Sequence, residues 1–158
     1  MPKHPQITIQ VGERMAPVDE QIAPLLLELW RAELDTLNSC QDNDGKVWIE
    51  FADVEHAETF LNAIGRFEEP VHSLYNRMSR KWVPPEWEQW VKDEAWEYDA
   101  HVWDRSVVEE LDENGDCTGE HATGPANFRF SLSLRFPHRD LEEVLQRMTQ
   151  FNSRKGND

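Results

Sequence analysis

Hydrophobic residues recur along the chain at two spacings, one typical of helices and one typical of strands. Apolar residues three and four positions apart lie on one helical face, and they predict helices from near Pro24, over residues 53–65 and over residues 138–151. Asp53 and Gly65 fit the first and last positions of the second helix. Alternating apolar and polar residues predict strands over residues 6–11, 35–40, 46–51, 96–103 and 128–136.

This order of elements predicts an α+β fold, with helices packed on an antiparallel or mixed sheet. The specific topology expected is a ferredoxin-like core with an appended strand and helix. A length of 158 residues fits a single domain over residues 1–158. Three segments differ from the rest in character: an inserted helical arm (66–93), an acidic hairpin connection (105–126) and a polar tail (152–158).

Two cysteines, Cys40 and Cys117, are too few to indicate a disulfide framework, so both are expected to be free thiols. The first residues lack the apolar run of a secretory signal. Apolar stretches also stay short of a membrane span. We therefore expect a soluble cytoplasmic protein.

The formal net charge is −15, from 16 basic and 31 acidic residues. Such a charge disfavours direct binding to nucleic acid or to an anionic membrane, because both require lysine and arginine. It favours a basic protein or nucleoprotein as partner. Ten acidic residues and one basic residue, Arg105, lie between Glu94 and Glu120, so this stretch carries nine of the fifteen excess negative charges.

The partner-binding residues expected from this pattern are acidic side chains and tryptophans. Tryptophan is a common anchor at interfaces, and the tryptophans expected to be exposed are residues 87, 90 and 103. The full candidate set is Glu97, Asp99, Trp103, Glu109, Glu110, Asp112, Glu113, Trp87 and Trp90. The alternative interpretation is a solubilising outer face that Arg129 and Arg135 partly balance.

Cys40 is the only candidate for a catalytic residue. A nucleophilic thiol needs a histidine, a cation or a helix N-terminus to lower its pKa, and only the fold can bring His56, His101 or His121 to it. The favoured interpretation is a small, buried residue. The alternative is a pocket that Thr36, Asn38, Ser39 and Gln41 line beside the thiol.

No metal and no cofactor are expected. Cys117 and His121 form one pair of ligand types, whereas a structural zinc site normally has two such pairs. Convergence of this pair with Cys40 is the alternative that the sequence leaves open. The sequence contains no glycine-rich motif of nucleotide-binding proteins, no G-x-S-x-G motif of hydrolases and no H-E-x-x-H motif of zinc proteases.

The stretch PVDEQIAPLLLELWRAELDTLNSCQ resembles uncharacterised small bacterial and phage proteins in which a helix leads into a T-x-x-S-C-Q element and a strand. The quoted stretch covers 25 of the 158 residues, about a sixth of the chain. The serine-cysteine pair before a strand is also similar to the tRNA wybutosine-synthesizing methyltransferases. That family implies a positively charged surface that faces RNA, which the net charge of −15 does not provide, so no activity follows from it.

Three functions are compatible with these features. The favoured one is a non-enzymatic acidic protein that sequesters or inhibits a basic protein or nucleoprotein, in the manner of phage inhibitors and immunity proteins. The second is a small-molecule or RNA-modifying enzyme that uses Cys40. The third is a structural subunit that forms a homodimer through exposed aromatic residues.

Overall fold

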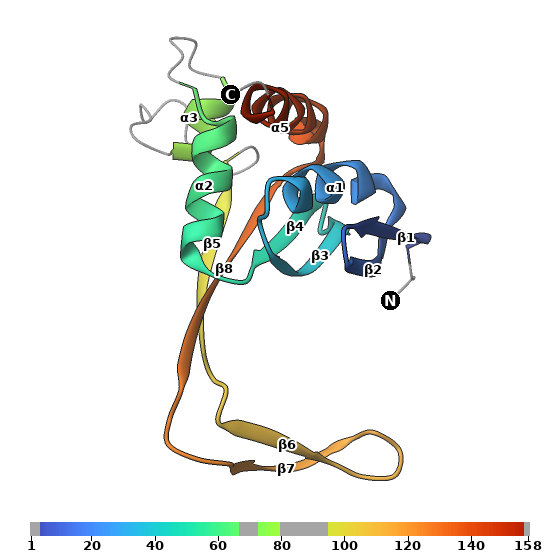
Figure 1. Ribbon diagram of the computed structural model, residues 1–158, viewed down its shortest axis with the longest axis vertical. Coiled ribbons are helices and arrows are strands. Elements are labelled where there is room, and N and C mark those ends of the chain that lie inside the picture. Colours follow the sequence, from blue (N-terminus) through green and yellow to red (C-terminus); the bar gives the residue numbers. More distant parts are fainter. Residues whose placement is uncertain (1–3, 67–72, 80–94, 157–158) are drawn as a thin grey trace.

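A four-stranded antiparallel sheet forms the centre of the computed structural model, which describes residues 4–66, 73–79 and 95–156 (Figure 1). Its strand order is β3 (Thr36–Asn43), β4 (Lys46–Phe51), β8 (Phe128–Pro137) and β5 (Glu97–Asp104). Asp44 and Gly45 turn the chain between β3 and β4 with φ values of 55° and 77°. This conformation is the one that Asp-Gly favours in hairpins.

Helices cover one face of this sheet. The long helices are α1 (Ala23–Arg31), α2 (Val54–Ile64) and α5 (Leu141–Lys155), and shorter ones are η1 (Glu20–Ile22), α3 (Leu74–Ser79) and η3 (His138–Asp140). The carboxylate of Asp53 accepts a hydrogen bond from the His56 amide at 2.8 Å and thereby caps α2. Alternate sheet residues pack under the helices, and the ring of Trp96 stacks on that of Phe136 at 4.6 Å.

A separate two-stranded sheet, β1 (Gln6–Val11) and β2 (Arg14–Asp19), precedes α1. Residues 6–11 form the predicted strand, and they pair with β2. The sequence pattern did not predict β2 because it contains Pro17, which a strand tolerates only at an edge. Gly12 makes the turn with a φ of 59°.

The strands β5 and β8 continue beyond the body of the molecule and carry a second hairpin at their far end (Figure 1). This hairpin consists of β6 (Val107–Leu111) and β7 (Cys117–Ala122), which form their own two-stranded sheet. Pairing of β4 with β8 stops at Leu132, so residues 128–131 of β8 pair only with β5. We call residues 101–131 the β-arm.

The α+β class and the packing of helices on an antiparallel sheet are confirmed. The chain order of the core differs from that of the ferredoxin-like core that was expected. Its βαββαβ order places a helix after the first strand, whereas here β3 joins β4 directly and α2 follows the hairpin.

Two of the three segments that differ in character overlap described helices. Within residues 66–93 the structure describes α3, and residues 67–72 and 80–94 lie outside the described part. The helix α5 extends through Lys155, into the segment expected as a polar tail. None of the described helices has the length and apolar composition of a membrane span.

Candidate functional site

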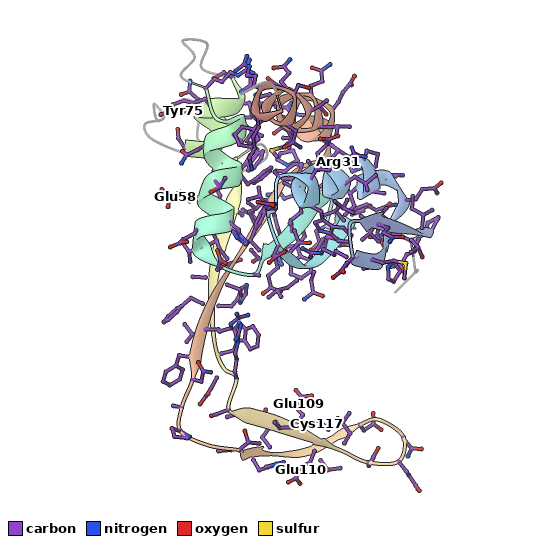
Figure 2. The ribbon with its side chains drawn as sticks, viewed as in Figure 1. Arg31, Glu58, Tyr75, Glu109, Glu110 and Cys117 are labelled. Atoms are coloured by element: carbon purple, nitrogen blue, oxygen red, sulfur yellow. The ribbon has the colours of Figure 1, made fainter. Side chains whose placement is uncertain are left out.

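Negative charge is concentrated at the far end of the β-arm. Between Ser106 and Asn127 there are six acidic residues and no lysine or arginine. Every residue of β6 is exposed, and Glu109 and Glu110 point to opposite sides of the hairpin (Figure 2). The β-arm therefore presents carboxylates on both of its faces.

Four of the acidic residues expected to bind a partner lie at this end of the β-arm. Glu109 is paired in register with Glu120, and the Glu110 carboxylate lies 3.0 Å from Nδ1 of His121. Asp112 has a structural role as well, since its side chain accepts hydrogen bonds from the amides of Asn114 at 2.8 Å and Asp116 at 2.9 Å. Glu113 is exposed beside it.

Asp104 fixes the junction between the two hairpins of the β-arm. Its carboxylate accepts hydrogen bonds from the Asn127 amide at 2.8 Å, from the Ser106 hydroxyl at 2.8 Å and from the Ser106 amide at 2.9 Å. These bonds, that from Asn127 above all, lower the pKa of Asp104 from its ordinary value. The charged form of Asp104 thus joins the end of β5 to the start of β8.

Glu97 and Asp99 do not belong to the same surface. They lie on the part of β5 that is in the main sheet, where Nζ of Lys46 is 2.7 Å from Glu97 and Nη1 of Arg135 is 3.9 Å from Asp99. A cation beside each carboxylate reduces the field that it presents to a partner. The alternative interpretation, of an outer face balanced by basic residues, describes these two positions better.

The tryptophan expected on the first long strand is exposed. Trp103 is 40% exposed, and the guanidinium of Arg129, its neighbour across the β-arm, lies 5.9 Å from the centre of the ring. This distance is close to the outer limit of a cation–π contact. Trp87 and Trp90 lie outside the described residues, so their expected role as anchors remains a prediction.

The β-arm also exposes an apolar face that the sequence pattern assigns to the core. Val102 and Phe130 lie directly opposite each other, and with Phe128 they are between 56% and 63% exposed. Along β8 the alternation of apolar and polar residues runs unbroken from Phe128 to buried Leu134 and Phe136. Spacing alone therefore cannot distinguish the exposed half of this strand from its buried half. An open groove of about 500 Å³ separates Phe128 and Phe130 from Val54 at the start of α2.

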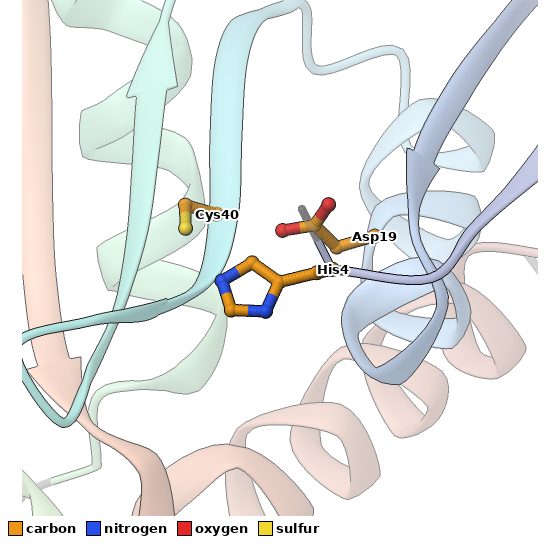
Figure 3. Close-up of side chains that lie close together, drawn as sticks. All are labelled: His4, Asp19 and Cys40. Atoms are coloured by element: carbon orange, nitrogen blue, oxygen red, sulfur yellow. The ribbon is translucent and has the colours of Figure 1, made fainter. Parts of the chain in front are cut away.

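Cys40 lies on β3 and is half-buried, in a group that the sequence did not indicate. This group consists of His4, Asp19 and Cys40, each of which has one possible metal-ligand atom within 4.8 Å of those of the other two. The three side chains come from different segments and point toward one another (Figure 3). The Cys40 thiol donates to the carbonyl oxygen of Asp42 at 3.3 Å, and Nε2 of His4 is 3.3 Å from the same oxygen.

The histidines considered for Cys40 have other partners. Nδ1 of His56 accepts a hydrogen bond from the Asp35 amide at 3.0 Å, Nε2 of His101 is 3.0 Å from the Ser133 hydroxyl, and His121 contacts Glu110. The histidine that lies close to Cys40 is His4. It was missed because Cys40 comes 36 positions later in the chain, and the β1–β2 hairpin that brings the two together was only half predicted.

Three of the four polar residues expected to line a pocket beside Cys40 have hydrogen-bond partners in the fold. The Thr36 hydroxyl accepts from Nε1 of Trp30, Asn38 donates to Glu50, and Oε1 of Gln41 accepts from the Gln21 amide. Each of these side chains is therefore directed at a structural partner. Cys117 is exposed on β7, and both cysteines are free.

Comparison of the chain with protein-family models, with curated proteins and with solved structures finds no match. Its function has to be inferred from charge, exposed surface and side-chain geometry.

Proposed function

We propose that the protein is a non-enzymatic binding protein whose β-arm captures and sequesters a basic protein or nucleoprotein. The observation that supports this most strongly is the combination of exposed apolar and acidic residues on one projecting element. Val102, Phe128 and Phe130 are more than half exposed, and the hairpin beyond them carries six acidic residues without a lysine or arginine. Contiguous exposed apolar residues rimmed by polar ones are typical of interaction sites.

The two features have different roles in binding. The carboxylates at the end of the β-arm attract a basic partner over a distance, which raises the association rate and makes it depend on salt. The aromatic residues then anchor it, because burying Phe128 and Phe130 removes apolar surface from water. The groove beside Val54 is placed to receive an apolar side chain of the partner.

Binding would also relieve a repulsion that is present in the free protein. Glu109 and Glu120 lie opposite each other, and like charges in this position destabilise a hairpin. A lysine or arginine of the partner between them would replace repulsion by two attractive contacts. The free energy gained in this way favours the complex over the free β-arm.

The test compares two variants with the same net charge. In the first, four acidic residues of the β-arm are neutralised (Glu109→Gln, Glu110→Gln, Asp112→Asn and Glu113→Gln). In the second, four exposed acidic residues of the body are neutralised (Glu13→Gln, Glu20→Gln, Glu58→Gln and Glu142→Gln). Each full-length protein is immobilised, exposed to lysate of its host cell at low and high salt, and its captured proteins are identified by mass spectrometry.

The expected result is a basic protein, captured at low salt and released at high salt, by the wild type and by the body variant. The β-arm variant is expected to lose it. Equal capture by all three proteins would show that the charge of the β-arm is irrelevant and would contradict the proposal.

A further inference from the structure

We propose that His4, Asp19 and Cys40 form a binding site for one Zn²⁺ ion. The first observation is the state of Asp19. Among the described residues four charged side chains are buried, namely those of Asp19, Arg77, Asp140 and Arg147. Arg77 pairs with Asp140 at 2.7 Å, and Arg147 pairs with Glu143. Asp19, which is 6% exposed, is in none of the ion pairs found among the described residues.

A buried carboxylate without a cation is costly, because it has lost its hydration without gaining an opposite charge. Asp19 recovers part of this loss through hydrogen bonds from the Gln41 amide at 2.9 Å and from Nε2 of Gln6 at 3.2 Å. Both donors are neutral. A cation bound beside Asp19 would supply the missing charge.

The neighbouring side chains define which cation. Within 4.8 Å of one another lie a thiol, an imidazole nitrogen and a carboxylate oxygen. Zn²⁺ binds this mixture of ligands, whereas Ca²⁺ and Mg²⁺ require several oxygen ligands and do not take a thiolate. The ligand set therefore selects Zn²⁺, or Co²⁺ as a spectroscopic substitute.

The geometry needs only a small contraction. Bonds of about 2.0–2.3 Å in a tetrahedral site place ligand atoms roughly 3.5 Å apart, so the three groups must approach one another by on the order of 1 Å. His4 precedes β1, whose pairing with β2 begins at Gln6, so sheet pairing does not fix the position of its backbone. The Asp42 carbonyl oxygen lies 3.3 Å from both Cys40 Sγ and His4 Nε2.

Outer contacts already orient the carboxylate. Both oxygens of Asp19 accept a hydrogen bond, one from Gln6 and one from Gln41, which is the arrangement that commonly surrounds a metal-ligating carboxylate. Binding would convert the Cys40 thiol to a thiolate bonded to Zn²⁺, with release of its proton to solvent. The ion would tie the β1–β2 hairpin to β3, since its ligands come from before β1, from the end of β2 and from β3.

The experiment uses the full chain without a histidine tag, reduced and freed of metal. Zn²⁺ is titrated by calorimetry and Co²⁺ by absorption, where a thiolate–cobalt charge-transfer band reports a sulfur ligand. The variants are Cys40→Ser, His4→Gln and Asp19→Asn. The matched controls are Cys117→Ser and His121→Gln, which remove the same ligand types from the exposed hairpin.

We expect one equivalent of Zn²⁺ to bind to the wild type and to both controls. Each of the three variants is expected to bind more weakly by at least about tenfold, since even an outer contact of a metal ligand is worth roughly 10–100-fold in affinity. Cys40→Ser should also abolish the charge-transfer band. Circular dichroism checks that each variant is folded. If Asp19→Asn does not fold, His4→Gln still tests the site, because the His4 side chain lies outside the core.

Two results would overturn the proposal. One is the absence of stoichiometric Zn²⁺ binding by the wild type. The other is binding that survives Cys40→Ser and is lost in Cys117→Ser or His121→Gln, which would place the metal on the β-arm. Neither result bears on the proposed capture of a basic partner, so the two proposals stand or fall separately.

Discussion

Glu109 on β6 lies directly opposite Glu120 on β7, so two carboxylates face each other on a stretch that contains no lysine or arginine. Glu120→Gln should therefore stabilise the isolated hairpin, by a few tenths of a kcal/mol. Hydrogen exchange of the β6 and β7 amides measures this change. Added salt should slow exchange in the wild type and have less effect in the variant, because screening removes the same repulsion. Faster exchange in Glu120→Gln would contradict this expectation.

The exposed phenylalanines of β8 should contribute to binding and little to folding. Phe128→Ala and Phe130→Ala are each expected to change the free energy of unfolding by no more than about 0.5 kcal/mol, because both side chains are more than half exposed. Phe136→Ala is the matched control on the same strand, where the fully buried ring should cost about 3–5 kcal/mol. Urea unfolding gives the three values. A large loss of stability in Phe130→Ala would show that the apolar face is covered in solution.

Asp104 should make the junction of the β-arm sensitive to acid. Its pKa is lowered by the hydrogen bonds from Asn127 and Ser106, so its charged form stabilises the folded junction. This contribution is complete above the ordinary pKa of 3.8 and is lost as pH falls below that value through the lower pKa of the folded state. The amide resonances of Ser106 and Asn127, followed by NMR from pH 6 downward, should shift together. Asp104→Asn should show little of this acid-dependent shift.

The buried pair of Arg77 and Asp140 should be essential for stability. The carboxylate of Asp140 also accepts a hydrogen bond from Nε1 of Trp96 at 3.1 Å, so its removal leaves a buried guanidinium and a buried indole N–H with one acceptor fewer. Asp140→Ala is expected to cost about 3–5 kcal/mol in urea unfolding. Asp35→Ala, which breaks the exposed pair with Arg14, should cost no more than about 1 kcal/mol. Similar losses in the two variants would contradict the importance of burial.

The two cysteines should differ in reactivity. Cys117 is exposed, whereas Cys40 is half-buried, so a thiol-alkylating reagent at neutral pH should modify Cys117 first. Mass spectrometry of digested samples follows each site separately. Zn²⁺ should slow the modification of Cys40 alone. Faster modification of Cys40 than of Cys117 without metal would instead favour an activated thiol and the enzyme hypothesis.

Local signals in the sequence predict local structure well. The Asp44-Gly45 turn and the Asp53 cap are satisfied by contacts within a few residues, so the β3–β4 hairpin and α2 appear where they are expected. The β1–β2 hairpin was only half predicted, because Pro17 conceals β2. The turn at Gly12, with alternating residues on both sides, was the signal available.

Sites that depend on the arrangement of elements were not predictable. Phe130 and Phe136 have the same place in the alternation, and they differ because β4 stops pairing with β8 at Leu132. Likewise, nothing near Cys40 in the sequence indicates His4 or Asp19, which come from segments that only the tertiary fold brings together. The acidic hairpin was predictable because its charges are consecutive in the chain.

The separation of the β-arm from the helix-covered sheet has an evolutionary consequence. Because residues 101–131 contribute little to the main core, folding constrains substitutions among them only weakly, and under the proposed function their main constraint is the partner. The body, held by buried contacts such as that of Trp96 with Phe136, is constrained mainly by folding. The two parts of the chain are thus free to diverge at different rates, and the same body can acquire new specificities through changes confined to one hairpin.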